Sequence, residues 1–301
     1  MRVLHIDTGK DMRGGQRQVL LLMSALTEAG HPSTLLALDR SPLSQAAAGA
    51  GHAVRPAEAK ELWRSSKLAD VVHAHDARAH TIAAIASRRP FVVSRRVAFP
   101  VRRSVASMWK YHRAPRFLAV SQFVAGQLQA AGIRNDKIDV VYDAVPPAPP
   151  ADPWNARSPA VALASRDPQK GRDLIERAAS LARISVLFSE DLSKDLARAS
   201  MFVYISRSEG LGSAALLAMS MGVPVVASNV GGLPEIFADT ASGLLVPNEP
   251  EAIARAMRRL LDEPDLAPSL VDRARARIAE KFTKQHLLRA TLASYERALV
   301  R

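Results

Sequence analysis

The segment 208–235, SEGLGSAALLAMSMGVPVVASNVGGLPE, constrains the fold more than any other part of the chain. In it, Glu209 precedes a glycine turn at 210–212, and the small and apolar residues 213–221 predict a helix. The apolar run 223–226 predicts a buried strand. The first N–H groups of a helix have no partners inside it, so a glycine turn that opens a helix is ready to bind a diphosphate.

Length and composition predict a globular protein of two domains. The chain has 301 residues, which is long for one hydrophobic core and suits two domains of roughly 150 residues each. Its 48% hydrophobic and 23% charged residues exclude a disordered or fibrous protein. No apolar run is long enough to predict a membrane-spanning helix, and the start MRVLHIDTG lacks the features of a secretory signal, so we expect a cytoplasmic protein. Without cysteine, the chain has no disulfides, thiolate metal sites or cysteine nucleophile.

Short apolar runs alternate with helical patterns along the chain, which is typical of parallel α/β layers. We expect strands at 3–6, 34–38, 71–73, 91–94, 117–120 and 138–142, and helices near 16–29, 78–87 and 121–131. Ser121 would cap the last of these helices, and Gly132 would end it. This predicts a Rossmann-like domain at 1–145. Residues 146–159 hold six prolines and are interpreted as a linker.

The α/β pattern restarts after the prolines and predicts a second domain at 160–283. We expect strands at 160–164, 184–188, 201–205, 223–226 and 244–246, and helices at 172–183, 192–199, 213–221, 250–261 and 266–282. A last helix at 284–301 could cross back to the first domain. The prediction is two doubly wound parallel-sheet domains that face each other across a cleft, with the ligand at the carboxyl ends of the strands.

Positive charge is unevenly spread. The net charge is +12, and no acidic residue occurs between Asp76 and Asp136. Segment 95–116 mixes arginines with apolar and aromatic side chains, which suits peripheral contact with an anionic membrane, here the inner face of the cell membrane. A solvated basic surface is the alternative, and no stacking motif or recognition helix indicates nucleic acid. The basic residues of the wider stretch are Arg78, Arg88, Arg89, Arg95, Arg96, Arg102, Arg103, Lys110, Arg113, Arg116 and Arg134.

Several segments together resemble the GT-B glycosyltransferases, in particular the large retaining family 4, whose signature has two glutamates eight residues apart. Segment 208–235 resembles that signature, and SRDPQKG at 165–171 resembles the first loop of the family's C-terminal domain. GGQRQVL at 14–20 resembles its N-terminal glycine loop, and DVVHAHD at 70–76 resembles the strand end where the family has a histidine. Segments 93–100 and 120–123 resemble its acceptor side.

The resemblance implies a set of site residues. Arg166 and Lys170 would stabilise the leaving diphosphate, Glu209 would position the donor sugar, and His75 would lie at the acceptor side. Arg95 and Arg96 would meet an anionic acceptor, or they belong to a solvated basic surface. The turn at 231–235 is interpreted as scaffold. The donor-binding residues would be Gly210, Leu211, Gly212, Ser213, Leu217, Gly14 and Gly15.

No metal and no cofactor are expected, since the nucleoside diphosphate sugar is a substrate. His73 and His75 face the same side of their strand by alternation, so a metal pair is conceivable. No third ligand stands at a recognisable spacing, however, which argues against a metal site.

Two departures from the family pattern concern the nucleotide. No glycine occurs from Arg172 to Glu209, where the family fits a further strand, glycine loop and helix, so the C-terminal domain is shortened. Leu217 stands where the second glutamate would accept hydrogen bonds from the ribose. Without that glutamate, the free energy of nucleotide binding is weaker by roughly 1.5–3 kcal/mol, which lowers the affinity for the nucleotide by about one to two powers of ten.

Two hypotheses follow. The first is a metal-independent retaining transferase that moves a hexose-type sugar from a nucleoside diphosphate to a lipid-linked or cell-surface polysaccharide or glycolipid acceptor. The second is an impaired GT-B protein that binds a sugar nucleotide weakly or serves as partner subunit of an active transferase. The sequence does not identify the sugar, the base, the acceptor or the oligomeric state.

Overall fold

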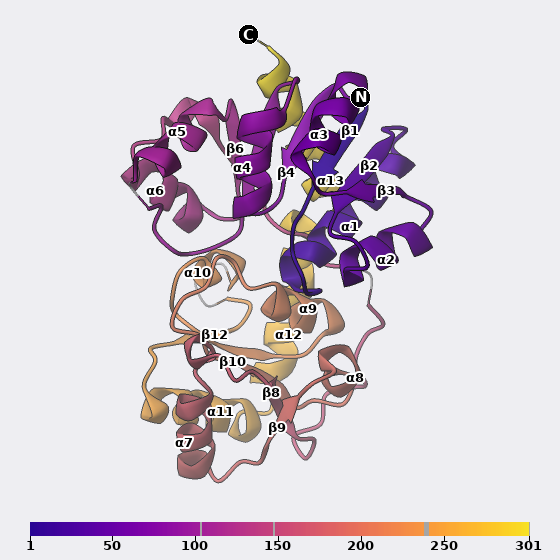
Figure 1. Ribbon diagram of the computed structural model, residues 1–301. Coiled ribbons are helices and arrows are strands. Elements are labelled where there is room, and N and C mark those ends of the chain that lie inside the picture. Colours follow the sequence, from indigo (N-terminus) through magenta and orange to yellow (C-terminus); the bar gives the residue numbers. More distant parts are fainter. Residues whose placement is uncertain (103, 147, 238–240, 301) are drawn as a thin grey trace. The chain divides into compact units, whose positions relative to one another are not determined.

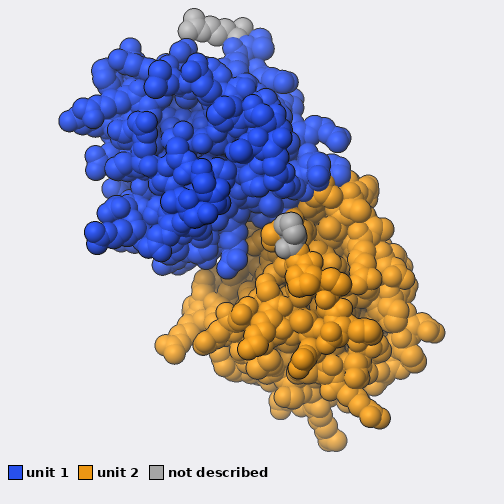
Figure 2. All heavy atoms as spheres, turned by 90° about the vertical axis from the view of Figure 1, so that its right-hand side faces the viewer, with its two compact units in different colours: residues 1–144, 284–301 blue, residues 145–283 orange. Residues whose placement is uncertain are grey.

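The structure, a computed structural model, describes residues 1–102, 104–146, 148–237 and 241–300. It divides into unit 1, residues 1–144 with 284–301, and unit 2, residues 145–283 (Figures 1 and 2). Three residues on which sequence predictions fall, Arg103, Pro147 and Arg301, lie outside the described residues. No helix in the described ranges is both long and apolar enough to cross a bilayer.

Unit 1 is built on a parallel sheet of seven strands in the order β3-β2-β1-β4-β5-β6-β7. The sequence missed only β3, which lies at the sheet edge with mostly exposed side chains and therefore has no apolar run. The other six were predicted to within two residues at each end. The strands are β1 (Val3–Ile6), β2 (Ser33–Ala37), β3 (Ala53–Pro56), β4 (Val71–Ala74), β5 (Phe91–Arg95), β6 (Arg116–Ala119) and β7 (Ile138–Val140).

Helices cover both faces of this sheet (Figure 1). One face carries α1 (Gly14–Glu28), α2 (Pro42–Gly49) and α13 (Lys284–Leu299), and α13 also contacts β5 and β6. The other carries α3 (Ala59–Ser65), α4 (Ala77–Ala86), α5 (Val105–Arg113) and α6 (Gln122–Ala130), as right-handed crossovers require. The Ser121 hydroxyl accepts from the Val124 N–H and caps α6 as predicted. Helices α2, α3 and α5 were not predicted.

The core of unit 1 combines the chain's two ends. Leu22 and Leu26 of α1 pack with Leu287 and Tyr295 of α13 and with the apolar side chains of the central strands. Lys284, at the start of α13, forms an ion pair of 2.6 Å with Glu28 of α1. The last helix is therefore part of the core of unit 1.

Unit 2 has a parallel sheet of five strands in the order β12-β11-β10-β8-β9. All five were predicted, but β11 begins at Val225 and not at Val223, because Pro224 has no N–H for the ladder and Val223 still bonds to Ala218 of the preceding helix. The strands are β8 (Ala160–Leu163), β9 (Val186–Ser189), β10 (Met201–Tyr204), β11 (Val225–Ser228) and β12 (Leu244–Val246).

The helices of unit 2 also lie in two layers (Figure 1). On one face α7 (Arg172–Ala182) packs against α11 (Pro250–Asp262), and on the other α9 (Ser213–Met221) packs against α12 (Leu266–Lys281). Short helices α8 (Leu192–Leu196) and α10 (Leu233–Phe237) complete the unit. The proline-rich stretch is fastened to it, since the Ala151 N–H donates to the Met221 carbonyl at 2.7 Å and the Trp154 indole to the Ser200 carbonyl at 2.8 Å.

Candidate active site

Glu209 lies at the centre of a polar cluster in unit 2. The Lys170 ammonium donates to Glu209 Oε2 at 2.7 Å, and the Tyr204 hydroxyl donates to the same oxygen at 2.6 Å. Lys170 ends a short 3₁₀ turn (Pro168–Lys170), and Tyr204 is the last residue of β10. The side chains of Lys170 and Glu209 are 27% and 16% exposed, so the ion pair is largely shielded from water. The structure thus brings two of the predicted site residues into direct contact.

Tyr204 was not among the predicted site residues. Burial and the neighbouring Glu209 charge raise the pKa of its phenol well above the usual 10. Tyr204 therefore stays a proton donor to Glu209 at neutral pH. The available signal was a hydroxyl at the carboxyl end of a strand of otherwise apolar residues.

The glycine turn beside Glu209 has the predicted form. Gly212 caps α9 with φ +114°, and a Cβ there would lie 2.6 Å from the Leu233 side chain. Within the ranges that the structure describes, no group accepts a hydrogen bond from the N–H of Leu211, Gly212 or Ser213. Unpaired N–H groups at the start of a helix are suited to bind an anion.

The segment 231–235, interpreted as scaffold, supports Glu209 through its backbone. A Cβ on Gly231 would lie 2.0 Å from the Glu209 carbonyl oxygen, so this approach requires glycine. The Gly232 N–H donates to that same carbonyl at 3.1 Å. The two glycines hold the residue that carries the carboxylate.

Arg166 is apart from this cluster. It is exposed and lies in a hollow of about 370 Å³, and within the described ranges its guanidinium forms no ion pair with Glu209. Leu217 is half-buried on α9. The hollow is lined by Ser165, Arg166, Asp167, Pro168, Arg172, Asp173, Glu176 and Arg207.

A second polar cluster lies in unit 1, where β4 and β5 end. Arg96 donates through Nε to Asp143 Oδ1 at 3.0 Å, and its Nη1 lies 3.4 Å from His75 Nδ1. The Arg96 and Asp143 side chains are only 14% and 9% exposed. Arg95 donates to the Tyr111 hydroxyl at 2.9 Å and to the Phe99 carbonyl. Both arginines are held by partners inside unit 1, and Arg96 is largely shielded, so a freely solvated surface does not describe Arg96.

Three histidines lie together next to Arg96. The parallel pairing of β1 and β4 sets His5 opposite His73, and the His73 and His75 ring centres are 3.9 Å apart. Spacing along the sequence indicated no third metal ligand, but in the structure one nitrogen from each of the three rings lies within 4.8 Å of the others. The missing partner came from a different strand, which spacing along the sequence does not show.

Most of these ring nitrogens are already engaged in hydrogen bonds and so are not free to bind a metal ion. His73 lies between the Tyr295 hydroxyl at 2.7 Å and the Ser94 hydroxyl at 2.8 Å. His5 Nδ1 and His75 Nε2 are 2.9 Å apart. Because a guanidinium can only donate, His75 accepts at Nδ1 and carries its proton on Nε2, which donates to His5. The proton of His5 is then on Nε2, which is buried and has no partner in the described ranges.

Burial keeps this cluster neutral. It lowers the pKa of His5 to about 3, and it lowers the pKa values of His73 and His75 well below the usual 6.5. The Arg96 charge lowers all three pKa values further. His75, which is 7% exposed, is thus an uncharged imidazole at neutral pH.

The predicted glycine pair begins α1 beside Arg96. A Cβ on Gly15 would lie 3.8 Å from Arg96 Cδ. The Gln16 amide donates to both carboxylate oxygens of Asp7 at 3.1 Å, and burial raises the pKa of Asp7. Asp7 and Asp143 were not predicted as site residues, although each is a carboxylate just beyond a strand's carboxyl end.

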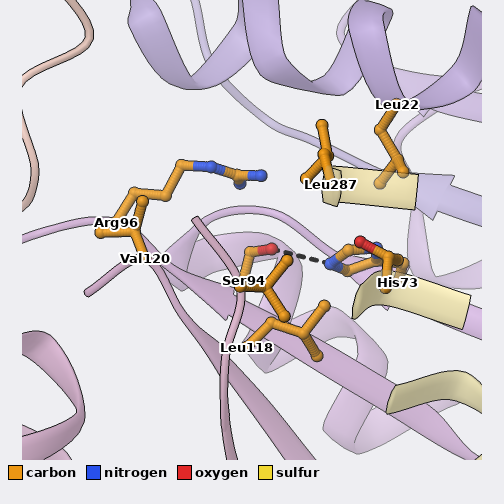
Figure 3. A pocket seen from close by; sticks show the side chains of 9 residues that line it. Leu22, His73, Ser94, Arg96, Leu118, Val120 and Leu287 are labelled. Carbon is orange, nitrogen blue, oxygen red and sulfur yellow. Dashed lines mark hydrogen bonds between the residues drawn. The ribbon is translucent and has the colours of Figure 1, made fainter. Parts of the chain in front are cut away.

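A small cavity lies behind Arg96 and His73 (Figure 3). Its volume of about 10 Å³ is close to the room that one water molecule needs. Ser94, which hydrogen-bonds to His73, lines it together with Thr291, whose buried hydroxyl has no partner in the described part of the chain. A single water here would satisfy Thr291.

Two family models match the chain. The model "Glycosyltransferase Family 4" matches residues 12–148, and the model "Glycosyl transferases group 1" matches residues 123–263. Together they extend over most of both units. The chain belongs to the family 4 glycosyltransferases of GT-B fold.

Similar proteins and structures agree with this assignment. The chain is 35% identical to the MMP alpha-(1→4)-mannosyltransferase of Mycolicibacterium hassiacum over 119 residues, 39% of this chain and 29% of that protein. It is 39% identical to the D-inositol 3-phosphate glycosyltransferase of Streptomyces coelicolor over 116 residues, 36% of this chain and 25% of that protein. The matches thus span less than a third of these relatives.

The fold match covers whole chains. The crystal structure of the Anabaena protein HepE superposes with a TM-score of 0.85 at 16% identity, covering 98% of this chain and 99% of that one. The five-stranded unit 2 lies within this match.

Proposed function

We propose that this protein is a retaining glycosyltransferase that moves a hexose-type sugar from a nucleoside diphosphate to a lipid-linked or cell-surface polysaccharide or glycolipid acceptor. The observation that carries the proposal is the cluster of Glu209, Lys170 and Tyr204 beside the unpaired amides of 211–213. This cluster suits a ligand that has both a diphosphate and sugar hydroxyls. The cation and the backbone N–H groups can bind the diphosphate, and the carboxylate can accept hydrogen bonds from the hydroxyls.

Lys170 and the amides of the glycine turn are assigned to the leaving diphosphate. Negative charge grows on the diphosphate as the sugar bond breaks, and donors already fixed in place stabilise it without reorganisation. The free structure pairs Lys170 with Glu209, so donor binding exchanges that contact for phosphate. Tyr204 keeps Glu209 hydrogen-bonded and leaves its other oxygen for the sugar hydroxyls. Arg166, exposed in the adjoining hollow, is a second cation for the nucleotide end.

The acceptor side is assigned to His75 and Arg96 of unit 1. The neutral His75 imidazole donates to His5 through Nε2, so an acceptor hydroxyl would hydrogen-bond to Nδ1 by replacing the 3.4 Å contact with Arg96. The shielded Arg96–Asp143 pair keeps the guanidinium beside this position. Retention of configuration is proposed to follow from front-face attack beside the leaving group, as the family resemblance implies. No metal or separate cofactor is part of the proposal, since the nucleotide sugar is the substrate.

The names of similar proteins support a sugar-nucleotide donor. HepE has been crystallised with UDP and with UDP-glucose, and the relatives above are named as mannosyl- and inositol phosphate glycosyltransferases. These ligands and substrates belong to those proteins and guide the choice of candidates here.

A turnover assay with UDP-, GDP- and ADP-sugars and membrane-extracted acceptors tests the function. We expect one donor to be consumed with an acceptor present, and Glu209→Ala to lose that activity. Full activity of Glu209→Ala would contradict the site assignment. Calorimetric titration with UDP, GDP and ADP addresses the second candidate, an impaired partner subunit, which Leu217 favours. Absence of both binding and turnover would favour that candidate.

Leu217→Glu is expected to tighten nucleoside diphosphate binding by about one to two powers of ten. A carboxylate at this position of α9 can accept hydrogen bonds from ribose hydroxyls, which leucine cannot. Titration of the variant against the parent protein measures the change, with Leu217→Met as an apolar control. An unchanged Kd in Leu217→Glu would show that this position does not contact the ribose.

A further inference from the structure

One exposed surface of unit 1 combines apolar and basic side chains. Val97, Phe99, Val105 and Trp109 are 43%, 62%, 89% and 46% exposed. Arg102, His112 and Arg113 are exposed beside them in the sequence. These seven residues, from α5 and the loop that precedes it, are called the α5 surface.

The geometry of α5 places its members together. Val105, Trp109 and Arg113 are spaced by four residues and therefore share one side of the helix. The Arg113 guanidinium lies 5.4 Å from the centre of the Trp109 ring. The opposite side of α5 faces inward: Tyr111 is buried, and the Lys110 ammonium donates to the Ala77 carbonyl at 3.1 Å.

Arg95 joins the preceding loop to this helix. Its guanidinium donates to the Phe99 carbonyl in the loop and to the Tyr111 hydroxyl on α5. Phe99 is thereby fixed next to the helix, and its ring projects to solvent. The apolar side chains of the α5 surface are thus presented by an anchored segment.

The charge of the α5 surface is of one sign. The sequence holds no Asp or Glu between Asp76 and Asp136. In the described part of the chain, no carboxylate forms an ion pair with Arg102 or Arg113, whereas Arg116, just beyond α5, is paired with Asp139 at 3.0 Å. Aromatic side chains with unpaired cations match the boundary of an anionic bilayer, where rings enter the headgroup region and arginines meet phosphates.

We propose that the α5 surface binds anionic membranes peripherally. Phe99, Val105 and Trp109 enter the headgroup boundary, and Arg102 and Arg113 contact lipid phosphates. Val97 directly follows Arg96, so membrane contact brings the acceptor-side residues of unit 1 close to lipid-linked molecules. This last step rests on the proposed function, whereas the membrane binding itself does not.

Co-sedimentation of the full chain with vesicles tests the proposal. We expect binding to vesicles of equal parts phosphatidylcholine and phosphatidylglycerol, none to phosphatidylcholine alone, and loss of binding as salt is raised. The double variant Phe99→Ser/Trp109→Ser should weaken binding by about tenfold or more. Leu187→Ser is the matched control, since Leu187 of unit 2 is 44% exposed.

Charge is tested separately. Arg102→Glu/Arg113→Glu should weaken binding by about tenfold or more. Arg157→Glu/Arg255→Glu alters net charge equally at exposed positions of unit 2 and should bind more tightly than the α5 variant. Equal weakening by both pairs, equal binding to both vesicle types, or retention on nucleic acid without vesicle binding would overturn the proposal. Turnover with a water-soluble acceptor should persist in Arg102→Glu/Arg113→Glu, which separates this result from failure of the proposed function.

Discussion

Replacing Lys170 by methionine is expected to lower kcat/KM for the nucleotide sugar by about 10²- to 10³-fold. The variant removes a cation that stabilises charge developing on the leaving diphosphate, in a site where water is partly excluded. Steady-state kinetics measures the effect, with the nucleotide sugar that is consumed in the turnover assay as the donor. Binding of the free nucleoside diphosphate should weaken as well, because its charge is present before and after transfer.

Two comparisons make this result specific. Lys194→Met removes an exposed lysine of the same unit and should leave kcat/KM unchanged. Thermal unfolding of Lys170→Met should remain close to that of the parent, because Tyr204 still holds Glu209 at 2.6 Å. A Lys170→Met enzyme with unaltered kinetics would show that the diphosphate lies elsewhere.

Acid is expected to destabilise unit 1 well before its carboxylates titrate. His5, His73 and His75 stay neutral in the folded state, because burial lowers their pKa values, but they bind protons in the unfolded chain below about pH 6.5. The unfolded state then binds more protons, so stability falls as pH falls. Each such histidine contributes a slope of up to about 1.4 kcal/mol per pH unit.

Urea unfolding between about pH 7 and about pH 4.5 measures this slope, because ordinary carboxylates titrate mostly below that range. His5→Phe should lower the slope of the unfolding free energy against pH by the contribution of one histidine, which is up to about 1.4 kcal/mol per pH unit. His112→Gln, which changes an exposed residue of α5, serves as control and should keep it. The buried Asp7, whose pKa is raised, acts in the opposite direction at the acid end of the range. A free energy of unfolding that stays constant down to about pH 4.5 would contradict the neutral cluster.

The fold was largely predictable because its strands are buried on both faces and appear as apolar runs. β10 and β11 illustrate this, with every side chain buried. β3 was missed for the opposite reason. Helix α5 was missed because only Tyr111 of its nine residues is buried, so the segment lacks an apolar stripe and appeared only as a basic and apolar stretch.

The site was predictable only in part. Lys170 and Glu209 were assigned from motif resemblance, and the structure joins them. His5 and Asp143 were missed because their roles come from contacts between distant segments, whereas Tyr204 contacts Glu209, only five residues further on, and its signal was overlooked. The place of His5 depends on the register of β1 against β4, and Asp143 matters only through its ion pair with Arg96. Spacing along a chain does not encode such pairings.

The position of α13 at the end of unit 1 affects the order in which the two units can complete their folding. Residues 145–283 are contiguous, so unit 2 has all its parts once they have been synthesised. The core of unit 1 lacks Leu287 and Tyr295 until α13 has been synthesised, although the strands of its sheet precede unit 2 in the sequence. During synthesis, His73 is therefore without its Tyr295 hydrogen bond until residue 295 has been added. Unit 1 is therefore completed after unit 2, once the residues of α13 have been synthesised.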